Sequence, residues 1–388
     1  MKFKTYQYSK HWTDTQAATG APEDIEEAKR AKQQLESLLS SILLSENLVI
    51  LTGLGTSLCI KDTAGNSAAP TMQDLWNSAK KATKDFDAIL TKVHQPKEAS
   101  GLWKEDIETL LSRCQMSIAL EEDALISAFI STTESMIATS CGFLSHLPAG
   151  SGLPIHESFL RKIARRPTRL QRAKLFTTNY DLCFETAAGA AGFVIIDGFS
   201  HTNPQEFDGL HFGYDIVRRE PESDVPSYIS NVIQLLKLHG SVDWERTPSG
   251  QVLRTSSPKK PVIIYPRSAK FESSYSQPYF EMMSRFQSAL RLPNTGLLIV
   301  GFGFNDAHLV GPLTSALKSN ASLRLLAVGP GYETKPPKFI QDIECLIDAG
   351  DRRLTAITTG FEELVGIIPD IKAPSEEELH QSRIKKVR

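Results

Sequence analysis

The chain has 388 residues and a net charge of −2, and 41% of its residues are hydrophobic. This length suffices for one large or two modest domains with a sizeable core, and the composition is that of a soluble globular protein. The balanced charge excludes a field strong enough to attract nucleic acid or an anionic membrane, so we expect no direct nucleic-acid binding.

Cysteine usage favours a reducing environment. The five cysteines are far apart and odd in number, and none forms a C-x-x-C pair; they are Cys59, Cys114, Cys141, Cys183 and Cys345. This pattern argues against a disulfide framework and against a structural zinc site. Since no run of 18 apolar residues occurs, we expect no membrane span and a cytoplasmic location.

Residues 1–46 are predicted to form an N-terminal helical segment. Pro22 suits the first turn of a helix, acidic residues follow it, and apolar residues then recur at helical spacing as far as Leu43. Residues 47–70 begin the main domain with LVILTG (48–53), a compact apolar run typical of a buried strand. A strand followed by a glycine-containing turn is the usual opening of an α/β nucleotide-binding fold.

Residues 71–170 differ in character and are predicted to be a helical insertion. Their apolar residues recur three and four positions apart, without the alternation typical of strands. Residues 171–370 return to strands alternating with helices, interrupted by a hairpin around the Pro-Ser-Gly turn at 248–250. The predicted fold is therefore α/β: a Rossmann-like parallel sheet with helices on both faces, plus a mainly helical inserted domain. Residues 371–388 are expected to be a charged, flexible tail.

The first stretch suited to chemistry is LTGLGTSLCI (51–60). Gly53 and Gly55 follow a strand, where a backbone without Cβ atoms can approach a pyrophosphate, and Thr56 and Ser57 can add hydroxyl donors. The third glycine of a G-x-G-x-x-G motif is absent, because Leu58 stands there. A tight strand-to-helix turn without a ligand is the alternative.

The second stretch is TTNYD (177–181), at the end of another predicted strand. Thr178, Asn179 and Asp181 would lie at the carboxyl end of the sheet, where doubly wound folds bind ligands. The alternative is a plain helix cap, because Asp181 precedes a helical stretch.

Two further stretches complete the set. His239 follows an apolar strand and precedes a glycine, and histidine is the natural proton acceptor near neutral pH, although a lone histidine is often structural. Gly301, Gly303 and Asn305 form a second glycine turn after a strand, where the alternative is an ordinary connecting loop. The other histidines show no ligand spacing, so no metal is expected.

The order of these motifs resembles the sirtuin superfamily. GLGTS is similar to the family's G-A-G-x-S turn, TTNYD to its T-Q-N-x-D, and LHG to the segment with the catalytic histidine, while VGFGF replaces a late G-T-S turn. The phrases APTMQDLW and GFGFNDAH look more like the prokaryotic sirtuin-like NADases of anti-phage defence. The resemblance covers about residues 47–76 and 174–329.

The departures from the family are informative. The zinc ribbon of the deacylases, with two C-x-x-C pairs, is absent, and CIKDTAGNSAAP (59–70) replaces the usual stretch after the phosphate turn. Both argue against a groove for an acyl-lysine peptide. The resemblance therefore implies a hydrolase that uses NAD as its substrate, with water as the acceptor and without a metal.

The resemblance also implies roles for individual residues. Asn179 would orient the water or the ribose, Asp181 would bind the nicotinamide carboxamide, and His239 would be the base. The remaining cofactor-binding residues would be Gly53, Gly55, Thr56, Ser57 and Thr178 on one side and Gly301, Gly303 and Asn305 at the adenosine end.

The same resemblance implies a homo-oligomer that is controlled by assembly or by a partner such as a HerA-type ATPase. Two alternatives stay open. One is an NAD-dependent ADP-ribosyltransferase or deacylase, and the other is a sensor that binds NAD or ADP-ribose without turnover.

Overall fold

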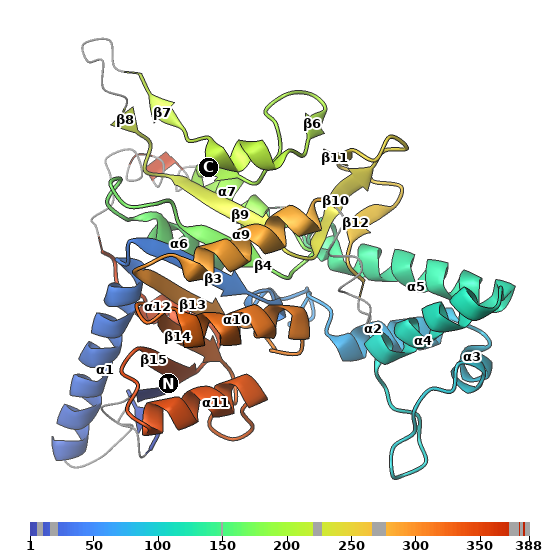
Figure 1. The fold of residues 1–388 in the computed structure, drawn as a ribbon, viewed down its shortest axis with the longest axis horizontal. Coiled ribbons are helices and arrows are strands. Elements are labelled where there is room, and N and C mark those ends of the chain that lie inside the picture. The colour runs from blue at the N-terminus through green and yellow to red at the C-terminus, as the bar shows by residue number, and fades with distance from the viewer. Residues whose placement is uncertain are drawn as a thin grey trace.

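The computed structural model describes residues 1–5, 11–15, 22–148, 150–219, 227–265, 277–371, 380 and 383–384. It shows a large sheet between two layers of helices, with a helical unit projecting to one side (Figure 1). The tail expected at 371–388 lies almost entirely outside the described residues.

The main sheet has nine strands in the order β2-β1-β15-β14-β13-β3-β4-β9-β5. All strands from β15 to β5 run parallel, and β1 and β2 are antiparallel at one edge. The bounds are β1 Lys2–Thr5, β2 Thr13–Asp14, β3 Asn47–Thr52, β4 Lys174–Thr177, β5 Val194–Ile196, β9 Val232–Lys237, β13 Thr295–Val300, β14 Arg324–Gly329 and β15 Leu354–Thr358.

Helices cover both faces of this sheet, which confirms the predicted fold class. One face carries α1 (Pro22–Leu43), α6 (Pro154–Ala164), α7 (Cys183–Ala191) and α12 (Phe361–Ile367). The other carries α9 (Tyr279–Arg291), α10 (Ala307–Ser319) and α11 (Lys338–Asp348). Within β3, Leu48 and Ile50 belong to the first core and Val49 and Leu51 to the second. A strand buried on both faces reads as a continuous apolar run, which explains LVIL.

The first residues differ from the expected helical segment. β1 adds to the edge of the sheet by pairing with β15, and Phe3 is fully buried in the core. A strand of four residues is too short to show periodicity in the sequence, because it is stabilised by its partner and not by its own pattern. The helix predicted after Pro22 is confirmed as α1.

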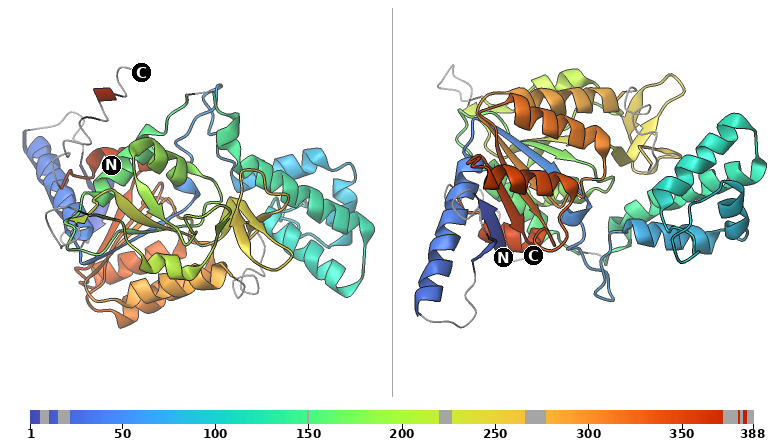
Figure 2. Two further views of the ribbon diagram at one scale, coloured as in Figure 1. Left: turned by 90° about the horizontal axis from the view of Figure 1, so that it is seen from above. Right: turned by 60° about the horizontal axis from the view of Figure 1, so that its bottom comes forward.

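The helical unit consists of α2 (Met72–Ala82), α3 (Phe86–Lys92), α4 (Ile107–Leu120) and α5 (Ala124–Cys141). These helices share their own apolar core around Trp76, Phe86 and Phe129 and project from the sheet (Figures 1 and 2). α6 also lies within the predicted insertion, but it packs against α7 and α12 beside the sheet. The division into domains stays a prediction.

A smaller antiparallel sheet connects the helical unit to the main sheet. Its order is β12-β10-β11-β6, with β6 Gln205–Glu206, β10 Gly240–Arg246, β11 Val252–Arg254 and β12 Pro261–Ile263. β10 and β11 are the hairpin predicted around the Pro-Ser-Gly turn. β7 (Val217–Arg218) and β8 (Ser227–Tyr228) pair separately. Ile263 and Tyr265 pack into the core of the helical unit.

The strand order creates a switch point beside β3. From β3 the chain builds the sheet in one direction through β4, then returns to place β13 on the other side. Ligands of doubly wound folds bind outside the carboxyl ends of the strands at such a point. In the part of the chain that is described, no helix combines the length and apolar character needed to cross a bilayer.

Candidate active site

A cavity of about 430 Å³ opens at the carboxyl ends of β3, β4, β9 and β13. Of the expected site residues, all except Thr56 and Ser57 line it. The lining residues among them are Gly53, Gly55, Thr178, Asn179, Asp181, His239, Gly301, Gly303 and Asn305. The fold therefore brings together four motifs that lie between positions 51 and 309 of the chain.

The two glycine turns contact each other directly. The amide of Gly55 donates a 2.9 Å hydrogen bond to the carbonyl of Gly301. A Cβ atom on Gly55 would lie 2.6 Å from the Cα of Gly301, and one on Gly301, whose φ is +61°, would lie 2.7 Å from the Cα of Gly55. Glycine is therefore required at both positions by their mutual approach, before any ligand is considered.

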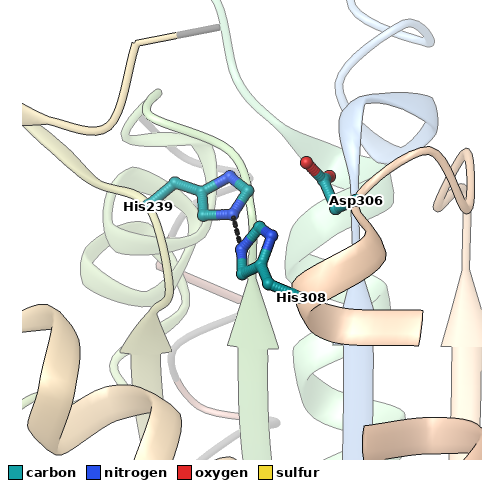
Figure 3. Close-up of side chains that lie close together, drawn as sticks. All are labelled: His239, Asp306 and His308. Atoms are coloured by element: carbon teal, nitrogen blue, oxygen red, sulfur yellow. Dashed lines mark hydrogen bonds between the residues drawn. The ribbon is translucent and has the colours of Figure 1, made fainter. Parts of the chain in front are cut away.

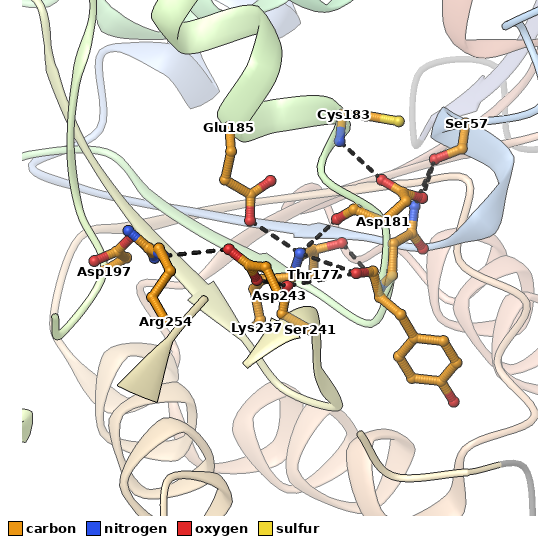
Figure 4. A network of polar contacts seen from close by, with 12 residues as sticks. Ser57, Thr177, Asp181, Cys183, Glu185, Asp197, Lys237, Ser241, Asp243 and Arg254 are labelled. Atoms are coloured by element: carbon orange, nitrogen blue, oxygen red, sulfur yellow. Dashed lines mark hydrogen bonds and ion pairs between the residues drawn. The ribbon is translucent and has the colours of Figure 1, made fainter. Parts of the chain in front are cut away.

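Thr56 and Ser57 face the interior, not the cavity. Both are fully buried, which differs from the expected contact with a pyrophosphate. Their hydroxyls hold Asn179 instead: its Nδ2 donates to the Ser57 Oγ over 2.9 Å and to the Thr56 Oγ1 over 3.4 Å. The Ser57 hydroxyl in turn donates to the Asp181 carboxylate over 2.7 Å (Figure 4).

This chain of hydrogen bonds determines how the Asn179 amide is oriented. A carboxylate can only accept hydrogen bonds, so the Ser57 hydroxyl must donate its hydrogen to Asp181. The Ser57 oxygen can then only accept a hydrogen bond from Asn179. Nδ2 of Asn179 therefore points inward to Ser57. The amide oxygen, Oδ1, is the atom left to meet a ligand in the cavity.

Asp181 both orients Asn179 and serves the following helix. Its second carboxylate oxygen accepts from the backbone amide of Cys183, the first residue of α7, over 3.1 Å. The N-cap of α7 is Leu182, so Asp181 lies one residue before the predicted cap position, although its side chain still bonds to the first helical amide. Its carboxylate is 7% exposed and already accepts two hydrogen bonds.

A buried lysine, Lys237, binds the backbone of the turn that contains Asp181. Nζ of Lys237, at the end of β9, contacts the backbone carbonyls of Tyr180 and Asp181 and lies 2.9 Å from Glu185 (Figure 4). Burial acts to lower the pKa of Lys237, but the charges of Glu185, Asp243 and Asp181 outweigh it and keep the pKa above its usual value. Lys237 therefore remains a cation that stabilises this turn.

His239 lies between β9 and β10, 3% exposed, and faces the cavity. Its Nε2 atom is 2.9 Å from the Nε2 atom of His308, in the first turn of α10 (Figure 3). One of these nitrogens must carry the proton and the other accept it, so the two rings set each other's tautomer. Asp306, the residue before α10, lies close to both.

Sequence reasoning missed His308 and Asp306 as site residues. The histidine spacing in the sequence shows no ligand pattern, because His239 and His308 meet only where the fold brings the end of β9 close to the start of α10. The available signal was local: an Asp-x-His sequence at the start of a helix that follows a glycine turn.

The helical unit also contributes to the cavity wall, which sequence reasoning did not anticipate. Met72, Leu75, Glu108 and Cys141 line it on this side. Burial raises the pKa of the Cys141 thiol to about 12, so the thiol is protonated at neutral pH and is unsuited to act as a nucleophile.

Comparisons with known proteins found a similar solved structure and a matching family model. A solved structure described as "Structural Basis for the Mechanism and Regulation of Sir2 Enzymes" is similar over 91% of this chain and 98% of that chain, with 11% identity and a TM-score of 0.41. A search among curated proteins gave no match. Residues 173–344 match the family model described as SIR2-like domain. This segment is less than half of the chain and includes TTNYD, His239 and the second glycine turn, and over it the chain is similar to SIR2-like domains.

Proposed function

We propose that the chain is an NAD hydrolase that cleaves the bond between nicotinamide and ribose to give nicotinamide and ADP-ribose. One observation carries the proposal: a single cavity joins two glycine turns, an oriented Asn179 amide and the imidazole of His239. The family-model match over 173–344 is consistent with NAD as the substrate.

Cleavage of the nicotinamide–ribose bond needs no acid residue to protonate the leaving group. Nicotinamide is already cationic when attached to the ribose, so it departs as a neutral molecule and needs no proton from an acid. The bond breaks through a transition state resembling an oxocarbenium ion, as in glycoside hydrolysis. The site must then hold the ribose, orient a water molecule towards the anomeric carbon and remove its proton.

The geometry suits this division of tasks. Oδ1 of Asn179 can accept a hydrogen bond from the water or from a ribose hydroxyl, because Nδ2 is already bonded to Ser57. The imidazole of His239 accepts the proton, directly or through a ribose hydroxyl. We assign Asp181 a positioning role through Ser57, and the lone pairs that it has left can accept a hydrogen bond from the nicotinamide carboxamide in the cavity.

Incubating the purified chain with NAD and following nicotinamide and ADP-ribose tests the proposal. We expect both products in equal amounts from the wild type. Asn179→Ala and His239→Ala should each reduce the rate by on the order of 100-fold or more, with unchanged circular dichroism. If either variant turns over NAD at the wild-type rate, its assignment is wrong.

The same assay separates the other two candidate functions. Isotope-labelled NAD that leaves its label on protein, or on an acyl group, would indicate transfer in place of hydrolysis. Tight NAD binding in calorimetry without release of nicotinamide would indicate a sensor.

We also propose that the activity depletes NAD in anti-phage defence and is controlled by assembly. An NADase that is always active would harm its own cell, which motivates control by a homo-oligomer or by a HerA-type ATPase. α1 and the helical unit are the surfaces we propose for such contacts. Assaying the chain alone and with the candidate ATPase, together with its mass in solution, tests this. Equal activity at every assembly state would contradict it.

A further inference from the structure

A group of three potential metal ligands lies beside the cavity, and two of them, His239 and Asp306, line its wall. His239 follows β9, and Asp306 and His308 lie at the start of α10 (Figure 3). Donor atoms of the three side chains all lie within 4.8 Å of one another. The proposed hydrolysis uses His239 and gives no part to the other two.

We propose that these three residues bind one divalent transition-metal ion of the zinc class, and that the bound ion blocks the cavity. Two imidazoles and one carboxylate are a donor set found at zinc and non-haem iron sites that keep open coordination positions. Metal binding stands on this geometry alone. Only the inhibitory consequence rests on the proposed NAD hydrolysis.

The histidine pair is nearly at the spacing that a metal requires. The two Nε2 atoms are 2.9 Å apart and share one proton. Two nitrogens on a tetrahedral zinc ion with bonds of 2.0–2.1 Å lie about 3.4 Å apart. An ion can therefore replace the shared proton if the rings separate by roughly 0.5 Å, which rotation about the side-chain bonds allows.

Both histidines are buried, and the backbone at His239 is held by a hydrogen bond, before any ion arrives. His239 and His308 are 3% and 6% exposed, and the carbonyl of His239 accepts a 2.8 Å hydrogen bond from the amide of Ile264. Rigid, buried ligands lose little conformational entropy on binding, which favours a metal over flexible surface histidines.

Asp306 supplies the third ligand from the same turn as His308. Its carbonyl accepts hydrogen bonds from the amides of Leu309 and Val310, so its backbone is fixed relative to His308. Its side chain lines the cavity and makes no capping bond to α10. A small rotation would bring the carboxylate to the ion, and the remaining coordination positions would face the cavity and take water.

A bound ion would interfere with hydrolysis in two ways. It would bind the imidazole of His239, which we propose as the base, and it would place a positive charge beside the cavity in which the cationic nicotinamide ribose must bind. Zinc-class ions would therefore act as reversible inhibitors that compete with NAD.

The test uses the full chain without a polyhistidine tag and titrates it with Zn²⁺ in a calorimeter. We expect one ion per chain. His308→Gln and Asp306→Asn, which preserve side-chain size, should each weaken Zn²⁺ binding by on the order of 100-fold or more. Even the loss of a residue that only hydrogen-bonds to a metal ligand lowers metal affinity by about 10–100-fold. His146→Ala removes an exposed histidine elsewhere and should bind as the wild type does.

A second measurement needs no variant. Co²⁺ bound by this site should give the visible absorption bands typical of a low-coordinate cobalt ion with nitrogen ligands, and Zn²⁺ should displace it. Absence of saturable Zn²⁺ binding, or equal binding by His308→Gln, overturns the proposal.

The outcome is separable from that of the proposed function. Zinc binding that depends on His308, in a chain without NAD turnover, would support the metal site and reject the hydrolase. NAD turnover without zinc binding would support the hydrolase and reject the metal site. If both hold, a chelator should restore the activity that Zn²⁺ removes, and Asp306→Asn should need a higher Zn²⁺ concentration for half-inhibition.

Discussion

The Ser57 hydroxyl donates a 2.7 Å hydrogen bond to the carboxylate of Asp181, 124 positions later in the chain. This bond joins the first glycine turn to TTNYD and leaves Ser57 able only to accept from Asn179. The direction of the Asn179 amide therefore depends on a carboxylate that Asn179 does not touch.

Ser57→Ala should reduce NAD turnover by on the order of 100-fold, because the Asn179 amide loses the acceptor that orients it. Asp181→Asn should have a similar effect, since an amide can donate to Ser57 and reverse the chain of hydrogen bonds. Release of nicotinamide measures both. In an Asn179→Ala background, Ser57→Ala should add little, because the two residues act as one unit. Fully additive losses would contradict this coupling, and Ser249→Ala on the exposed hairpin serves as the control.

The contact between the two glycine turns predicts that alanine substitutions at three glycines will differ in their effect on the free energy of unfolding. Gly55→Ala and Gly301→Ala should each lower the free energy of unfolding by about 1–3 kcal/mol, because each Cβ would lie under 3 Å from the opposing backbone. Gly303→Ala is the matched control: it lines the same cavity, but its nearest neighbour would be 3.5 Å away. Its stability should change by less than about 0.5 kcal/mol. Urea unfolding of the three variants checks the order, and equal effects would show that the turns can move apart.

The ion pair beneath TTNYD predicts a stability defect that a second substitution can relieve. Lys237→Met should cost about 3 kcal/mol of unfolding free energy, because it strands the partly buried Glu185 and two backbone carbonyls. Burial raises the pKa of Glu185, and losing Lys237 would raise it further. Adding Glu185→Leu should recover much of the loss. Chemical denaturation of the single and double variants measures the coupling, and the absence of recovery would mean that the carbonyl contacts dominate.

The burial of His156 predicts that the folded chain loses stability as the pH falls below 6.5. His156 is packed between Phe184 and Phe361, and burial lowers its pKa from 6.5 to about 4. Between these values the unfolded chain binds a proton that the folded chain does not, so stability falls as the pH drops from 6.5 towards 4. The full effect is about 3 kcal/mol. Above pH 6.5 the residue is neutral in both states and contributes no pH dependence.

His156→Phe removes the titrating group while keeping an aromatic ring in the same place. Its unfolding free energy should fall less than that of the wild type between pH 7 and pH 4.5, when both are measured by urea denaturation. His146→Phe, at an exposed position, should follow the wild-type pH profile. Parallel profiles for His156→Phe and the wild type would show that the pKa of His156 is the same in the folded and in the unfolded chain.

Most of the fold could be predicted from the sequence because its strands and helices carry their own patterns. LVIL in β3 is apolar throughout because helices cover both faces of the sheet. α9 repeats apolar residues at helical spacing because only one side of this helix packs against the core. β1 is the exception. Its four residues form a strand only because β15 offers an edge to pair with.

The order of motifs along the chain also sufficed to name nine of the residues that line the cavity, because parallel strands bring their carboxyl ends to the same edge. What those residues contact depended on the tertiary structure. Ser57 faces Asp181 and not the cavity, Gly55 is required by Gly301, and His239 has His308 as its neighbour. Local sequence specifies which residue types stand at the end of a strand. Hydrogen bonds and close contacts between distant segments form only when the sheet places those segments side by side, so their pairing is decided by packing.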